Sequence, residues 1–176
     1  MDDNILIPTY ISKYGCYSSA CIFIASIFVS VYKYYVTAGL ALGQSVISYF
    51  NWKTVYKMGW VKTIDIIIAS VMIIYITAVD SVTFYPEYRI LWYCTVAIIA
   101  SVFIVNELLL YYQVKTRIYD ESSAVKFSYF SLNYTYPGTE QRKYAYYRST
   151  FTHILLIHLL PVIVFIYCVY HSNRRL

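Results

Sequence analysis

The chain has 176 residues, of which 60% are hydrophobic and only 13% are charged. Soluble domains carry charge at roughly a quarter of their positions, so this composition excludes an ordinary soluble domain and favours a protein of the lipid bilayer. The net charge of +5 is spread over the expected loops and termini, which argues against nucleic acid and for anionic lipid headgroups as partners. One polytopic membrane domain, residues 1–176, is expected.

The first spanning helix is predicted over 14–34, an uncharged stretch that ends at Lys33 among several tyrosines. The residues before it are acidic where a signal peptide would be basic, and they lack the arginines of a transit peptide. We therefore expect the chain to keep Met1.

Residues 36–52 are also uncharged, but no Gly or Pro lies near Lys33 to turn the chain back. Helical spacing places apolar side chains on one side of this segment and Thr37, Gln44, Ser48 and Asn51 on another. An amphipathic helix in the membrane interface, or an extension of the first span, is predicted. Gly39 and Gly43 form a small-residue pair that would let another helix pack closely.

Two further spans, 62–82 and 90–112, form a helical hairpin joined by a short segment that contains Pro86. Each span carries one carboxylate near the end remote from that connection, Asp65 in the first and Glu107 in the second. The hairpin is the clearest membrane signal of the chain.

After the hairpin the sequence becomes polar, and residues 125–149 are rich in aromatic and β-favouring residues around Pro137-Gly138. A small β-hairpin on the membrane surface is predicted there. The last span is predicted over 150–171, with a kink at Pro161, which cannot donate a helical hydrogen bond and crowds the Ile157 carbonyl. The expected class is therefore all-α integral membrane, with four spans.

With four spans, ten lysines and arginines fall on one side of the membrane and four on the other. The positive-inside rule then predicts that both termini lie outside, in a lumen, a periplasm or an intermembrane space. A glycosylation sequon at Asn133 would then lie inside, so either it goes unused or the orientation is the reverse, and the charge count favours the first.

The same topology brings ionisable groups of different spans into one leaflet. Charges well inside the bilayer are costly and usually paired, for example Lys33 with Glu107 or Asp65 with His153. One interpretation is a docking network that fixes how the helices pack, and it is the favoured one because most of these groups lie near helix ends. The other is a half-membrane ion or proton pathway with Glu107 and His158 as relay groups. The network consists of Lys33, Asp65, Glu107, His153 and His158.

No cofactor, metal site or enzymatic activity is expected. The sequence lacks phosphate-binding, GxSxG and HExxH motifs, and its four cysteines contain no CxxC pair. His153 and His158 are five residues apart, a spacing that would not place both on one face of an α-helix.

No family resemblance is specific enough to name. The leading hypothesis is a non-catalytic, accessory subunit of a larger membrane complex of the energy-transducing or respiratory type, with the mitochondrial inner membrane slightly favoured as its location. Its partners would be other membrane subunits and lipids. One alternative is a small homo-oligomeric ion channel or transporter with Glu107 in its pathway, and another is a tetraspan scaffold or viral envelope protein.

Overall fold

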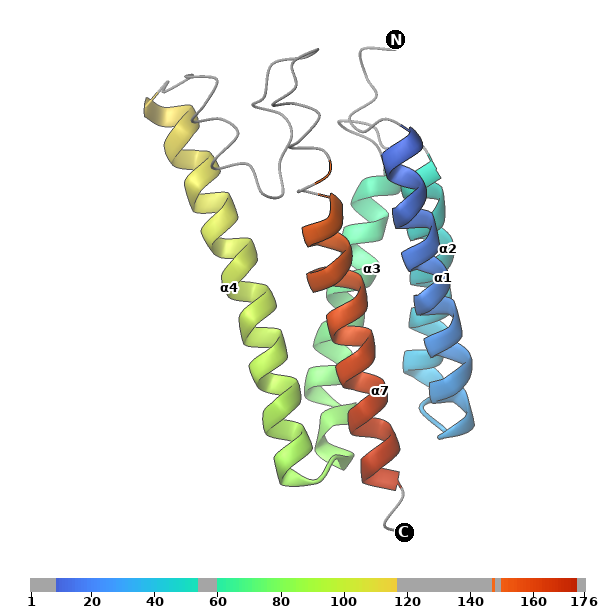
Figure 1. Cartoon of the computed structure of the whole chain (residues 1–176). Helices are drawn as coiled ribbons and strands as arrows, with labels where there is room; N and C mark the ends of the chain where they lie inside the picture. Colours follow the sequence, from blue (N-terminus) through green and yellow to red (C-terminus); the bar gives the residue numbers. More distant parts are fainter. Residues whose placement is uncertain (1–8, 54–59, 117–146, 148–149, 174–176) are drawn as a thin grey trace.

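The structure, a computed structural model, describes residues 9–53, 60–116, 147 and 150–173 (Figure 1). These residues are almost entirely helical and contain no strand, so the predicted helical class is confirmed. The β-hairpin predicted over 125–149 lies almost wholly outside the described residues. The elements in order are α1 (Thr9–Val31), α2 (Tyr35–Lys53), α3 (Trp60–Ala78), the 3-10 turn η1 (Asp80–Thr83), α4 (Pro86–Thr116), the π-helical η2 (Ile154–Leu159) and α7 (Leu160–Asn173).

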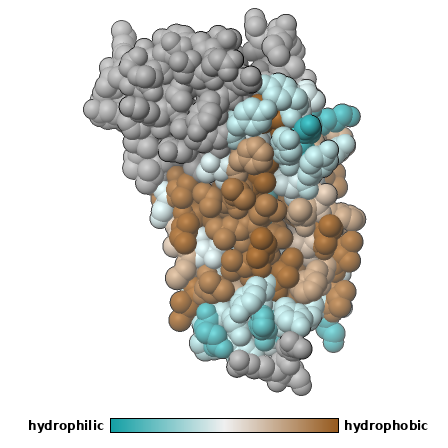
Figure 2. Space-filling model, viewed as in Figure 1, coloured by the Kyte–Doolittle hydropathy of each residue, from teal (hydrophilic) through white to brown (hydrophobic). Residues whose placement is uncertain are grey.

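Three helical segments of the described chain are long and apolar enough to cross a membrane: Thr9–Val31, Trp60–Thr83 and Thr150–Asn173. Figure 2 shows an apolar band around the middle of the visible face, with more polar surface on either side of it. This pattern fits a multi-pass membrane protein. The predicted span 90–112 lies within α4, but many of its side chains fall outside the described residues, so the fourth span stays a prediction.

The chain reverses direction at Lys33, where the sequence offers no evident turn. After α1 ends, the N–H groups of Lys33 and Tyr34 donate to the carbonyls of Ser30 and Val29 at 3.0 and 3.1 Å. These two bonds form a Schellman motif, in which the residue after the helix cap takes the left-handed conformation that glycine usually supplies. Lys33 takes it with a φ of 68°. The expected extension of the first helix past this residue is therefore wrong.

Beyond this turn, α2 runs antiparallel beside α1 (Figure 1). The last turn of α2 meets the first turns of α1, where the indole of Trp52 lies directly on Gly15: a Cβ built on Gly15 would stand 2.0 Å from Cδ2 of the ring. Nearby, the Cys16 thiol lies 3.9 Å from the Tyr49 carbonyl oxygen. The two helices thus pack along their whole length.

The polar face of α2 lies inside the bundle and its apolar face lies on the outside, which is the reverse of the arrangement in an interfacial helix. Its polar residues Thr37, Gln44 and Ser48 are buried, whereas Val36 and Phe50 are exposed. An interfacial helix directs its polar face to water. In α2 that face meets α3 and η1, where Gln44 donates to Asp65 and Thr37 donates to Asp80. Small residues of α1 permit α2 to approach closely on its other side. This packing gives no support to an interfacial helix over 36–52. The small buried residues of α1 are Ser12, Gly15, Ser18, Ser19, Ala25 and Ser26.

Thr9 and Asn173, the first and last described residues, lie at opposite ends of the bundle (Figure 1). The prediction that both termini share one side assumed four crossings, but α2 adds a fifth helix to the alternating order. Lys33 consequently lies at the end where α3 meets α4, beside η1. Asp65 lies near the start of α3 and His153 just before η2, and both of these helix starts lie toward the other end of the bundle (Figure 1). The prediction that Lys33 shares their leaflet is therefore wrong.

The last helical segment contains a π-helical turn just before Pro161. In η2 the Leu160 N–H donates to the carbonyl of Leu155, five residues earlier. Pro161 has no N–H to give to Ile157, and its ring crowds the preceding turn. The wider π-helical turn accommodates this local mismatch. A kink at Pro161 itself stays a prediction.

A cluster of buried apolar residues lies where α3, α4 and α7 come together. At its centre Trp92 is 1% exposed, donates from Nε1 to Thr77 Oγ1 at 3.0 Å, and lies 5.7 Å from the ring of Phe165. The buried members of the cluster are Val29, Ile76, Phe84, Trp92, Phe165, Cys168 and Val169. The guanidinium of Arg89 closes the adjacent turn by donating to the carbonyls of Ser81, Val82 and Phe84.

Candidate functional site

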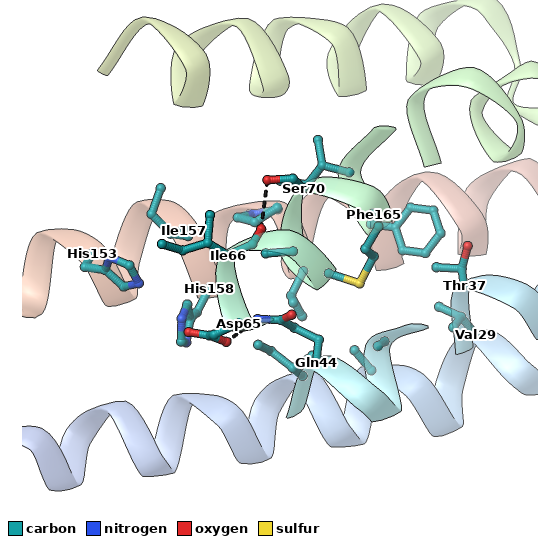
Figure 3. A pocket seen from close by; sticks show the side chains of 18 residues that line it. Val29, Thr37, Gln44, Asp65, Ile66, Ser70, His153, Ile157, His158 and Phe165 are labelled. Atoms are coloured by element: carbon teal, nitrogen blue, oxygen red, sulfur yellow. Dashed lines mark hydrogen bonds between the residues drawn. The ribbon is translucent and has the colours of Figure 1, made fainter. Parts of the chain in front are cut away.

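An internal cavity of about 150 Å³ lies between α1, α2, α3 and the last helical segment (Figure 3). Its ionisable residues Asp65, His153 and His158 gather toward one end together with Gln44. Toward the other end the cavity reaches Thr37, and its walls there are mainly apolar, with Val29, Met72, Ile73 and Phe165. The space is therefore polar at one end and apolar along most of its length.

Asp65 is the carboxylate of this cavity and is only 7% exposed. It lies five residues after Trp60, about 8 Å along the span at 1.5 Å per residue. Its two oxygens accept hydrogen bonds from Gln44 Nε2 at 2.6 Å and from Asn51 Nδ2 at 2.9 Å, both on α2. Since these donors are neutral amides, an ionised Asp65 keeps its full negative charge inside the bundle.

Two histidines of the last helical segment share the cavity with Asp65. His158 is 4% exposed, and its Nδ1 lies 2.7 Å from Ser18 Oγ on α1. The ring of His153 lies 5.1 Å from that of His158. Because i→i+5 hydrogen bonding in η2 widens the turn, residues five apart come to the same side of the helix. The prediction that the two histidines cannot share a face is wrong for this reason.

Trp52 lies edge-on against both imidazoles, with ring centroids 5.3 Å from His153 and 6.1 Å from His158. Its buried Nε1 has no hydrogen-bond partner among the described residues, and neither does Gln44 Oε1. Unpaired polar atoms are costly away from water, and where they border a cavity a buried water or a ligand usually supplies the partner. A positive charge also acts on His153 from Lys62, on the first turn of α3.

Of the residues predicted to form an intramembrane network, the structure brings Asp65, His153 and His158 together and leaves Lys33 at the opposite end. The side chain of Glu107 lies outside the described residues, although its backbone belongs to α4. A pairing of Lys33 with Glu107 is wrong, because Lys33 lies beside η1, near the start of α4, and Glu107 follows Pro86 by about 30 Å of helix at 1.5 Å per residue. Asp65 is bonded to α2 rather than to His153.

Gly39 and Gly43, the predicted packing pair, face away from the helices of the described chain. A Cβ built on either glycine has no atom within 4 Å. The pair therefore makes no close helix contact within the described residues.

Sequence reasoning placed Gln44 and Asn51 on the polar side of their segment but gave them no role at Asp65. It also missed Ser18 and Trp52, because contact with them depends on α2 folding back onto α1. The available signal was the combination of amide side chains seven residues apart, on one face of an uncharged helix, with a carboxylate in the next span.

Carboxylate and imidazole groups within one cavity can bind and exchange protons, since both change protonation state readily. No group of three or more His, Cys, Asp or Glu side chains in the described part of the chain could hold a metal ion. Proton binding is thus the chemistry that these side chains offer.

Comparisons with known proteins give no further guide. The sequence matches no protein-family model, and neither curated proteins nor solved structures provide a match.

Proposed function

We propose that this protein is a small ion channel or transporter that moves protons through a site centred on Asp65. The observation that carries the proposal is a buried carboxylate, bonded to neutral amides, that shares a cavity with His153 and His158. A charge well within a bilayer costs about 2.5–3.5 kcal/mol on insertion scales, and it usually marks an ion path or a paired site.

The unpartnered atoms distinguish this proposal from a network that only docks helices. A docking network is most stable when each buried polar atom has a partner. Gln44 Oε1 and Trp52 Nε1 have none among the described residues, and both border the polar end of the cavity or its histidines. Ordered water in the cavity would satisfy them and would also conduct protons between Asp65 and His158.

The proposal requires α2 to lie within the bilayer at the depth of α3, because Gln44 and Asn51 of α2 hold the carboxylate of Asp65. The bundle then has five crossings. Asp65 takes up the proton, the two amides hold its oxygens in place, and His158 exchanges protons with it through water. A contribution of Glu107 to the pathway stays a prediction.

The test uses the full chain in liposomes that contain a pH-sensitive dye, with a potassium diffusion potential to drive protons inward. Asp65→Asn keeps the size of the side chain but cannot ionise, so proton uptake should fall roughly a hundredfold. Ser70→Ala is the matched control: Ser70 lines the same cavity, but its hydroxyl donates to its own helix at the Ile66 carbonyl. Equal uptake by the Asp65→Asn variant and the unaltered protein would contradict the proposal.

A second candidate is the non-catalytic subunit of a larger membrane complex, and the open face at Gly39 and Gly43 supports it. Small-residue pairs let helices of separate chains approach closely in lipid. Purification in mild detergent tests this: a stable partner should be retained, and Gly39→Leu with Gly43→Leu should release it. A chain that migrates alone would contradict it. A scaffold or envelope role and a mitochondrial location stay predictions.

A further inference from the structure

The cavity that holds Asp65 ends at Thr37, and Thr37 connects it to a second carboxylate. Thr37 is 2% exposed, lines the cavity, and donates a hydrogen bond from Oγ1 to Asp80 Oδ2. Asp80, which is 7% exposed, lines a separate pocket of about 410 Å³ at the end of the bundle where Lys33 and Asn173 lie. The two spaces therefore lie on either side of this side-chain hydrogen bond.

We propose that the hydrogen bond between Thr37 and Asp80 is a latch that closes the Asp65 cavity toward this second pocket. The bond joins the first turn of α2 to η1. The hydroxyls of Tyr34 and Thr83, 2.7 Å apart, hold the same two segments together beside it, so breaking the Thr37–Asp80 bond frees the Thr37 side of the boundary without separating the helices. The idea that protons pass this latch rests on the proposed function. The closure of the cavity by the latch does not.

The hydroxyl of Thr37 has another acceptor within reach of one side-chain rotation. Serines elsewhere in the bundle donate to the carbonyl three residues earlier, as Ser18 does to Gly15 at 2.8 Å and Ser45 to Leu42 at 2.7 Å. Threonine in helices likewise divides between rotamers because its hydroxyl can bond to the preceding turn. For Thr37 that acceptor is the carbonyl of Tyr34. Two bonded positions of one hydroxyl give the latch its closed and open states.

The surroundings of the latch explain why one bond can act as a barrier. Between Thr37 and the polar end, the cavity is bordered by Val29, Met72 and Phe165, so water gains few partners there. Asp80 provides the nearest strong acceptor beyond this apolar stretch. When the hydroxyl turns away from it, a hydrated path can extend from the pocket into the cavity.

The experiment measures access to the cavity with a charged, membrane-impermeant thiol reagent. Ala41 is 5% exposed and lines the cavity one turn after Thr37, so Ala41→Cys reports entry. The full chain is placed in nanodiscs after its native cysteines, Cys16, Cys21, Cys94 and Cys168, are replaced by alanine.

Thr37→Ala removes the donor and should raise the labelling rate about tenfold, the effect of losing one hydrogen bond. Thr37→Ser keeps the hydroxyl and should label at the original rate. Asp80→Ala breaks the bond from its other side and should raise labelling similarly, which keeps the test valid if one variant fails to fold. Access through the Asp65 end is the same in all these chains, so the difference reports the latch.

Labelling of folded Thr37→Ala or Asp80→Ala at the rate of Thr37→Ser would overturn the latch. That result would leave the proposed function standing if proton uptake still depended on Asp65. Faster labelling without any Asp65-dependent uptake would support the latch and overturn the proposed function.

Discussion

At one end of the bundle, aromatic rings pack together where α3, α4 and α7 meet, and the Trp92 indole among them is hydrogen-bonded. At the other end a cavity lies among ionisable side chains, and buried polar atoms lack partners among the described residues. We call the first the aromatic end, formed by Phe84, Trp92 and Phe165, and the second the cavity end, formed by Asp65 and His158. Well-packed interiors leave few voids. The difference indicates that the aromatic end contributes more to the stability of the fold. At the cavity end, close packing is incomplete around the ionisable side chains of the proposed site.

The largest effect is expected at the aromatic end. Trp92→Ala removes a side chain that is 1% exposed and should lower the free energy of unfolding by about 3–5 kcal/mol. Reversible unfolding in mixed detergent micelles measures it. Trp60→Ala is the control, since Trp60 is 71% exposed and should matter little. If both variants lose the same stability, the aromatic end is not the stabilising one.

At the cavity end, Gly15→Ala should lower the free energy of unfolding by about 1–3 kcal/mol, because the new methyl would overlap the indole of Trp52. Gly39→Ala, which meets no atom within 4 Å, should leave it unchanged or raise it by about 1 kcal/mol through helix propensity. The same unfolding measurement compares them. If Gly15→Ala left the free energy of unfolding unchanged, the indole of Trp52 would have to move aside without cost, and the predicted overlap would be contradicted.

Filling the cavity should raise stability while lowering transport. Ala69→Val adds two carbons to the cavity wall and should gain about 1 kcal/mol after its loss of helix propensity is subtracted. Proton uptake into liposomes should fall in parallel. Ala78→Val, at an exposed position of the same helix, should change neither quantity. Loss of stability in Ala69→Val would mean that the cavity cannot accept the added volume.

The smallest effect is expected at the turn between α1 and α2. Lys33→Gly removes the Cβ from a residue in the left-handed conformation, which should stabilise the folded state by about 1–2 kcal/mol. Because glycine is more flexible in the unfolded chain, the net gain in the free energy of unfolding should be roughly 0.5 kcal/mol. Lys33→Ala keeps the Cβ and should gain nothing. Thermal unfolding of the two variants side by side detects the difference, and equal midpoints would contradict the role of backbone strain.

Length and hydropathy were enough to predict the three helices that are apolar and long enough to cross a membrane, because each consists of nearly continuous apolar residues. The reversal after the first one could not be predicted, since it uses Lys33 in a conformation that the sequence signals with glycine. The orientation of α2 was missed for a related reason. Its amphipathic spacing was visible, but a polar face can turn to water or to a neighbouring helix, and the sequence does not distinguish the two.

The ionisable residues inside the spans were predicted to form a network because such groups are costly in lipid and rare. Of Lys33, Asp65, Glu107, His153 and His158, the structure brings Asp65, His153 and His158 together. The identity of their partners depended on the fold. The amide of Gln44 reaches Asp65 only after α2 turns back, and His153 joins His158 only because the π-helical turn changes the spacing of side chains. Local patterns thus located the site, while tertiary packing assembled it.

The left-handed lysine at the end of α1 also bears on how the protein enters the membrane. In the five-crossing arrangement that the proposed function requires, Lys13 and Lys33 exchange sides relative to the four-span order, yet the division of lysines and arginines remains ten to four. For that arrangement the positive-inside rule predicts the start of α1 on the cytoplasmic side and the end of α7 on the other. The backbone conformation of Lys33 would then influence which end of the bundle is carried across the bilayer.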